Sequence, residues 1–170
     1  YQIEAREENK TALLVVCDGM GGANAGNVAS RFAAQVFTES IKAALTGALD
    51  AKTRQELLIR ALDEANETVF SLAGRQPAFR GMGTTLAAAL VQLDQVTILN
   101  VGDSRAYLFY GTSLQQPTDD HSYVQEMRRQ RRITDHDARP PPQTTLTPPA
   151  AGLVPVPDAA LASHRPRQRH

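Results

Sequence analysis

Residues 18–22 read Asp18-Gly19-Met20-Gly21-Gly22 and directly follow an apolar run, Thr11 to Cys17. A short apolar run bounded by turn residues is typical of a buried strand, so the pattern predicts a carboxylate at a strand tip. Glycine adopts backbone conformations that other residues avoid and allows a close approach of the backbone to a ligand. A long amphipathic segment follows, which gives the order strand, glycine-rich bend, helix. Taken alone, Asp18-Gly19 favours an ordinary turn over a metal ligand.

Two further glycine motifs accompany this bend. Gly81-Met82-Gly83-Thr84-Thr85 opens a second apolar run, and Val101-Gly102-Asp103-Ser104-Arg105 lies between a third and a fourth. The three motifs, in this order and with the elements between them, resemble the metal-dependent protein phosphatase family, the type 2C serine/threonine phosphatases. The resemblance covers roughly residues 1–132. Met20 stands where some eukaryotic members carry His, so the chain looks like the bacterial form.

The hydrophobic pattern predicts helices and strands between the motifs. A β-hairpin is expected from Tyr1–Glu4 and Ala12–Cys17, and apolar residues at helical spacing predict a helix from Ala25 to Leu45. A second helix is expected to start at a capping box and to reach Leu72. The capping box is Thr53-Arg54-Gln55-Glu56, and the expected later strands are Thr84–Val91, Val96–Val101 and Arg105–Tyr110.

Helices packed on antiparallel strands give an α+β fold. The resemblance implies a four-layer sandwich of two antiparallel β-sheets flanked by helix pairs, here incomplete. We expect residues 1–134 to be a partial phosphatase domain of this type. Residues 135–170 hold eight of the ten prolines and are rich in arginine. Such a composition cannot offset its ordering entropy by burial, so we predict a disordered tail. A shifted reading frame of a GC-rich gene is a hypothesis for its origin.

The composition limits which kinds of partner are expected. The formal net charge is zero, which argues against a nucleic-acid or anionic-membrane partner, and the run Arg128–Arg132 is interpreted as a solvated helix end. No apolar run approaches the ~20 residues of a membrane-spanning helix. We expect a cytoplasmic monomer.

The single cysteine, Cys17, lies inside an apolar run and is predicted to be a small buried hydrophobe and not a nucleophile.

The resemblance implies a site for two Mn²⁺ or Mg²⁺ ions. By position, Asp18 matches the carboxylate that bridges the two ions, and the Gly19 carbonyl matches a backbone ligand to one of them. Asp103 matches a position associated with a third, weaker ion. An Asp there can also shape the turn through its own backbone, and the sequence leaves both roles open.

Other polar residues near the motifs are interpreted as structural. His121 lies in an Asp-His-Ser element where helix capping by Asp119 or Asp120 is favoured over a general-acid role. Thr84 and Thr85 are expected to pack in a strand.

Several elements of the family have no match in this chain. The Arg-x-x-Asn-Glu-Asp element would precede Tyr1, and Glu7 and Glu8 do not fit it. The later Ser-Asp-Gly element and Asp-Asn pair have no counterpart in residues 139–170. The sequence therefore resembles an amino-terminal part of the family, and we expect its activity to be impaired.

Three functions are compared. The favoured one is hydrolysis of phosphoserine or phosphothreonine in proteins, the substrates of a serine/threonine kinase. The alternative is a non-catalytic phosphoprotein- or partner-binding module derived from the same fold. A glycine-loop nucleotide binder is disfavoured, because no Gly-x-x-x-x-Gly-Lys-Ser/Thr occurs.

Overall fold

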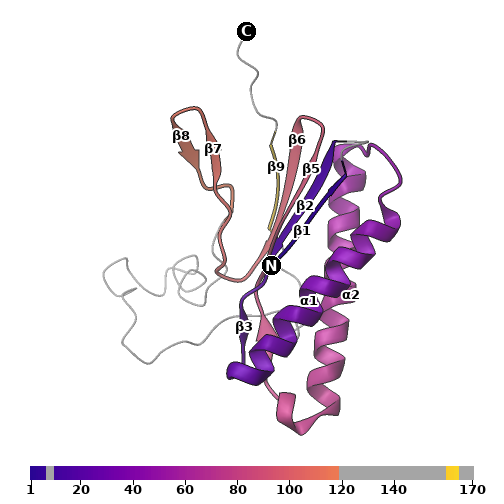
Figure 1. The fold of residues 1–170 in the computed structure, drawn as a ribbon, viewed down its shortest axis with the longest axis vertical. Coiled ribbons are helices and arrows are strands. Elements are labelled where there is room, and N and C mark those ends of the chain that lie inside the picture. Colours follow the sequence, from indigo (N-terminus) through magenta and orange to yellow (C-terminus); the bar gives the residue numbers. More distant parts are fainter. Residues whose placement is uncertain (7–9, 119–159, 165–170) are drawn as a thin grey trace, which may run out of the picture.

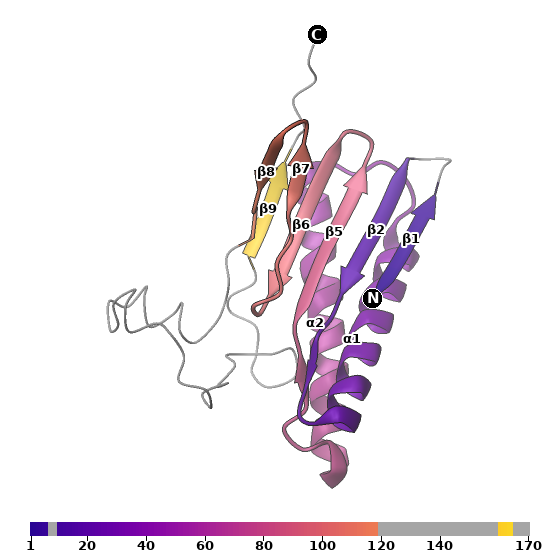
Figure 2. The same ribbon diagram turned by 60° about the vertical axis from the view of Figure 1, so that its left-hand side comes forward.

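The structure is a computed structural model that describes residues 1–6, 10–118 and 160–164. Five strands form one sheet in the order β1-β2-β5-β6-β9, and every neighbouring pair is antiparallel (Figure 2). These strands are β1 (Gln2–Arg6), β2 (Thr11–Val16), β5 (Leu86–Gln92), β6 (Gln95–Val101) and β9 (Ala160–His164). The expected first hairpin is thus confirmed as β1 and β2.

Two long helices, α1 (Ala23–Ala44) and α2 (Ala51–Arg75), lie side by side on one face of the sheet (Figure 1). Both confirm the helices expected from the apolar spacing, with bounds that differ by one to three residues. Alternate residues of the central strands point toward the helices and are buried with apolar residues of both. The largest fully buried side chains of this core are Val15, Phe37, Ile41, Leu58, Leu62, Leu86, Leu90 and Leu99. No helix in the described ranges is long and apolar enough to cross a bilayer.

The start of α2 differs from the predicted capping box. The side chain of Asp50 caps the helix, because its Oδ1 accepts a hydrogen bond from the Thr53 N–H at 2.8 Å. This bond holds the pKa of the Asp50 carboxyl below its ordinary value. Thr53 therefore lies inside the first turn, and the prediction that it begins a capping box was wrong.

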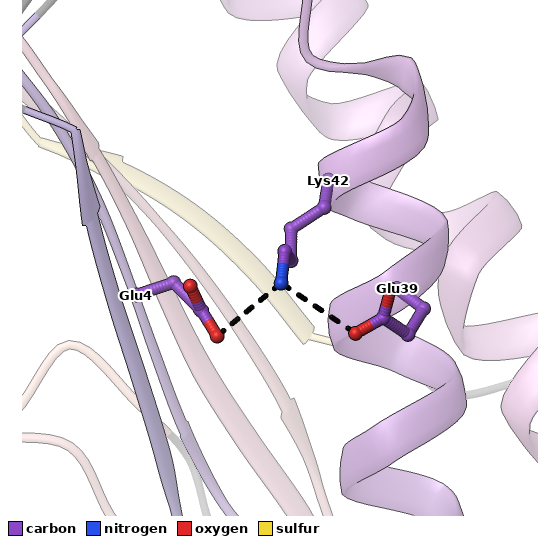
Figure 3. A network of polar contacts seen from close by, with 3 residues as sticks. All are labelled: Glu4, Glu39 and Lys42. Atoms are coloured by element: carbon purple, nitrogen blue, oxygen red, sulfur yellow. Dashed lines mark hydrogen bonds and ion pairs between the residues drawn. The ribbon is translucent and has the colours of Figure 1, made fainter.

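A small ion-pair network joins the first strand to the first helix. Lys42 Nζ of α1 lies 3.5 Å from Glu4 Oε1 of β1 and 3.6 Å from Glu39 Oε1 of α1 (Figure 3). All three side chains are partly exposed, so the network contributes little to stability. The ion pair from Glu4 to Lys42 lies on the face of β1 that is turned toward α1.

The opposite face of the sheet carries a separate hairpin. Strands β7 (Leu108–Tyr110) and β8 (Ser113–Gln115) pair with each other on the side away from the helices (Figure 1). The expected strand Arg105–Tyr110 is thus shorter and does not pair with β6. On the same face, Ile3, Leu14 and Val16 lie exposed. The α+β class is confirmed, while the second pair of layers in a four-layer sandwich stays a prediction.

The last strand of the sheet lies where no strand was expected. Residues Ala160–His164 pair along β6, from Asn100 to Val96. A strand can form here without an apolar pattern, because pairing of the two backbones satisfies the N–H and C=O groups that β6 would otherwise leave open at the sheet edge. The predicted boundary at residue 134, the Arg128–Arg132 helix end and the rest of the predicted tail lie outside the described residues.

Candidate metal site

Three chain segments meet at one end of the sheet. Asp18 follows the end of β2, and Asp103 follows the end of β6. Because β5 is antiparallel to both strands, its start, at Leu86, lies between these two ends, with Val16 opposite Ala87 and Leu86 opposite Val101. The ends of β2 and β6 are two strand spacings apart, which is about 10 Å. The sheet thus brings the first and third glycine motifs to the same edge, with the second motif between them.

The backbone of Asp18 is held from the β5 side. Its carbonyl accepts hydrogen bonds from Thr85 N at 2.9 Å and from Thr84 Oγ1 at 3.0 Å. Its N–H donates to Thr85 Oγ1 at 3.0 Å. The Asp18 residue is exposed, so the carboxylate is not sealed into the core although the backbone is fixed. Both threonines are buried. Thr84 lies in a strand as expected, whereas Thr85 lies in a break between β4 and β5, so the expected strand Thr84–Val91 is interrupted. Their bonds to Asp18 were not predicted from the sequence.

Gly19 is packed against the first helix. It belongs to the short strand β3 (Gly19–Met20), which pairs with β4 (Gly83–Thr84). A Cβ added to Gly26 of α1 would lie 2.8 Å from both the carbonyl carbon and the carbonyl oxygen of Gly19. The missing side chain at residue 26 therefore allows the backbone of α1 to lie this close to Gly19.

Asp103 lies on a bend that glycine produces. Gly102 has a φ of 97° and is buried, whereas Asp103 is exposed. The bend therefore has a source of curvature that does not depend on the Asp103 side chain. Ser104, the next residue, forms a hydrogen bond to Thr85, with 2.6 Å between the two hydroxyl oxygens. The same threonine thus contacts both the Asp18 bend and the Asp103 bend.

The donors at this edge are oxygens: the carboxylates of Asp18 and Asp103 and the Gly19 carbonyl. Such hard donors suit Mg²⁺ and Mn²⁺ better than softer metals. Within the part of the chain that the structure describes, no three His, Cys, Asp or Glu side chains are grouped closely enough to hold a metal. His121, Glu7 and Glu8 lie outside the described residues. The oxygens at this edge are of the type that a divalent ion binds, and alone they are too few for a complete ligand set.

Cys17 is half-buried beneath this edge and contacts both hydrophobic clusters of the domain. The second cluster is made of Ala25, Ala29, Ala33, Val69 and Met82. Burial raises the pKa of the Cys17 thiol to about 12. The thiol therefore stays neutral near pH 7, in agreement with its interpretation as a small hydrophobe and not a nucleophile.

Residues 2–153 match the family model of protein phosphatase 2C. The chain belongs to this family. A serine/threonine phosphatase, stp, from Listeria welshimeri is 38% identical over 148 residues, which cover 86% of this chain and 58% of that protein. The serine/threonine protein phosphatase PstP of Mycobacterium tuberculosis is 35% identical over 137 residues, covering 79% of this chain and 25% of that protein.

Solved structures of serine/threonine phosphatases share the fold. The serine/threonine phosphatase Stp1 from Staphylococcus aureus superposes with a TM-score of 0.82 at 32% identity, over 97% of this chain and 64% of that chain. The M. tuberculosis phosphatase PstP/Ppp gives 0.75 at 30% identity, over 98% of this chain and 72% of that chain. The family assignment from the three motifs, in its bacterial form, is therefore confirmed. The chain spans 58% of the length of the Listeria relative.

Proposed function

We propose that this protein hydrolyses phosphoserine and phosphothreonine in proteins and requires Mn²⁺ or Mg²⁺. The observation that carries the proposal is that Asp18, Gly19 and Asp103 lie at one sheet edge, with the Asp18 backbone held by hydrogen bonds with Thr84 and Thr85. Membership of the protein phosphatase 2C family supports it, as does the name serine/threonine phosphatase of the relatives.

The proposed roles come from the resemblance of the three motifs to those of the family. Asp18 would be a ligand of both catalytic ions, the Gly19 carbonyl would bind one of them, and Asp103 would bind a third ion more weakly. When bound, the ions would polarise the phosphoryl group and make water a better nucleophile. The exposed carboxylate of Asp18 attracts the cations, and its fixed backbone limits how far that carboxylate moves. Positioning matters because small misplacements in such sites cost orders of magnitude in rate.

The proposed substrates are proteins phosphorylated by a serine/threonine kinase, so the protein would act in signal transduction. Support comes from the names of the relatives, which specify serine/threonine phosphatases. Action as a monomer in the cytoplasm is part of the same proposal. The lone free thiol of Cys17 is compatible with a reducing compartment.

The deciding experiment is Mn²⁺-dependent hydrolysis of p-nitrophenyl phosphate and of a phosphothreonine peptide. It compares residues 1–170 with an extended version in which the family elements without a match here, the upstream acidic element and the later Ser-Asp-Gly and Asp-Asn elements, are restored. We expect clear turnover by the extended version and little by residues 1–170, because two carboxylates fix two ions poorly. Asp18→Asn in the extended version should abolish turnover, whereas Asp63→Asn on the exposed face of α2 should not.

Two results would contradict the proposal. One is turnover that does not depend on a divalent ion, and the other is turnover that survives Asp18→Asn. Tight binding of the phosphothreonine peptide by the extended version without any turnover would favour the non-catalytic binding module.

A further inference from the structure

Thr85 connects the two bends that carry the predicted metal ligands. Its hydroxyl accepts a hydrogen bond from the Asp18 N–H at 3.0 Å and shares a second one with the Ser104 hydroxyl at 2.6 Å. Ser104 directly follows Asp103 in the chain. A single hydroxyl thus joins segments that are 67 residues apart on one side and 19 residues apart on the other.

The methyl group of Thr85 has a separate role. A Cβ added to Gly102 would lie 2.8 Å from Thr85 Cγ2, so this methyl occupies the space that the glycine leaves. Thr85 is 8% exposed. Its two γ-substituents are therefore both used: the methyl group packs on the Gly102 bend, and the hydroxyl bonds to Asp18 and Ser104.

Residues 84 and 85 hold both backbone polar groups of Asp18. The Asp18 carbonyl accepts from Thr85 N and from Thr84 Oγ1, while its N–H reaches the Thr85 hydroxyl. Removing the Thr85 hydroxyl would leave the carbonyl bonds in place and free only the N–H side. It would also release Ser104. Loss of the Thr85 hydroxyl would thus uncouple the two bends without breaking the strand contact.

We propose that Thr85 is a positioning residue whose hydroxyl couples Asp18 to the Asp103 bend and keeps the two carboxylates at a fixed separation. The metal part of this inference rests on the proposed function. Ligand groups in binding sites are effective when neighbouring hydrogen bonds fix them to about 0.5 Å. A Thr that served only packing would use its methyl group, and its hydroxyl would be dispensable.

Variants of Thr85 separate these two roles. Thr85→Ser keeps the hydroxyl and loses the methyl group, whereas Thr85→Val keeps the shape and loses the hydroxyl. The first measurement is amide hydrogen exchange at Asp18 in the metal-free chain, with the Leu90 amide of β5 as the internal control. We expect roughly tenfold faster exchange at Asp18 in Thr85→Val, the fold-change for one lost hydrogen bond. Exchange in Thr85→Ser should stay close to wild type.

The second measurement is Mn²⁺ binding, followed by the electron paramagnetic resonance signal of the free ion. Thr85→Val should bind roughly tenfold more weakly and Thr85→Ser should resemble wild type. Ser104→Ala should speed Asp18 exchange in the wild-type background but add nothing in the Thr85→Val background, because the route between the two bends is then already broken.

The inference is overturned if Thr85→Val changes neither measurement, or if Thr85→Ser loses as much as Thr85→Val. Absence of Mn²⁺ binding by the wild-type chain would instead overturn the proposed metal site. In that case the Asp18 exchange rates still decide whether the coupling between the bends exists.

Discussion

Gly19 and Gly26 approach so closely that a Cβ on Gly19 would lie 1.9 Å from the Gly26 carbonyl oxygen. This contact joins the short strand β3 to the first turns of α1, and only two residues without side chains can make it. The position of the predicted backbone ligand, the Gly19 carbonyl, therefore depends on a residue of the helix.

Gly26→Ala is expected to destabilise the protein even though Ala is the better helix former. The new Cβ would lie 2.8 Å from backbone atoms of Gly19, and relieving such an overlap costs about 1–3 kcal/mol. That cost exceeds the gain of up to about 1 kcal/mol from helix propensity. The measurement is the free energy of unfolding in urea, together with Mn²⁺ affinity, which should also fall.

The matched control is Gly74→Ala in α2, where an added Cβ has no neighbour within 4 Å. This change should be neutral or stabilising by up to about 1 kcal/mol. If both substitutions stabilise, the Gly19–Gly26 contact does not constrain the bend.

Arg54 is buried in the first turns of α2 and is held by neutral acceptors. Its Nε donates to Thr97 Oγ1 at 3.1 Å, one terminal nitrogen donates to the Leu49 carbonyl at 2.6 Å, and the other contacts Gln95 Oε1. These bonds tie the helix start to the β6 strand and to the α1–α2 connection. Arg54→Met would leave the acceptors unsatisfied, and we expect a loss of about 3 kcal/mol in urea unfolding.

The control for Arg54 is Arg60→Met, which makes the same chemical change at an exposed position of the same helix. It should change the free energy of unfolding by less than about 0.5 kcal/mol. Equal effects of the two substitutions would show that the buried bonds contribute nothing specific.

Much of the helix layer could be predicted from the sequence because its signal is periodic. Apolar residues such as Phe37 and Ile41 recur at helical spacing and are buried as expected. The helix cap was less predictable. Asp50 and Thr53 are both residue types that cap helices. Which of them caps α2 depends on the path of the chain after α1, and the sequence around these two residues does not reveal that path.

The sheet edge and the contacts of the site depended on long-range pairing. Residues 160–164 bind β6 through backbone hydrogen bonds, which leave no side-chain pattern. Asp18 and Asp103 were found from their motifs, and their roles remain proposals. The hydrogen bond from Asp18 to Thr85 was missed because the sequence does not show whether the hydroxyl of a Thr beside a strand forms a hydrogen bond or only packs.

The rate at which Cys17 is alkylated should depend on pH in a way that reveals the burial of its thiol. Burial raises the pKa of the folded-state thiol to about 12, while an unfolded Cys titrates near ~8.5. The unfolded chain releases its proton first, so stability from this group is complete below the unfolded pKa and falls as the pH rises toward 12. Iodoacetamide should therefore label the native chain slowly up to pH 10, and the urea-unfolded chain with a midpoint near ~8.5. The chain has one cysteine, so the signal has a single source, and a native midpoint near that of the unfolded chain would contradict the burial.

The two predicted carboxylate ligands should differ in their effect on Mn²⁺ binding. Asp18 has a backbone held on both its N–H and its carbonyl, whereas Asp103 lies exposed on a glycine bend. Replacing a carboxylate by the amide keeps the shape and removes the charge. We expect Asp18→Asn to weaken Mn²⁺ binding by at least tenfold, which is about 1.4 kcal/mol, and Asp103→Asn to weaken it less. Asp63→Asn, on the exposed face of α2, should leave it unchanged. The free Mn²⁺ signal in electron paramagnetic resonance measures the affinity of all three variants.

A larger loss of affinity in Asp103→Asn than in Asp18→Asn would reverse the proposed roles. Equal losses in Asp18→Asn and Asp63→Asn would show that Mn²⁺ binds only through nonspecific surface charge.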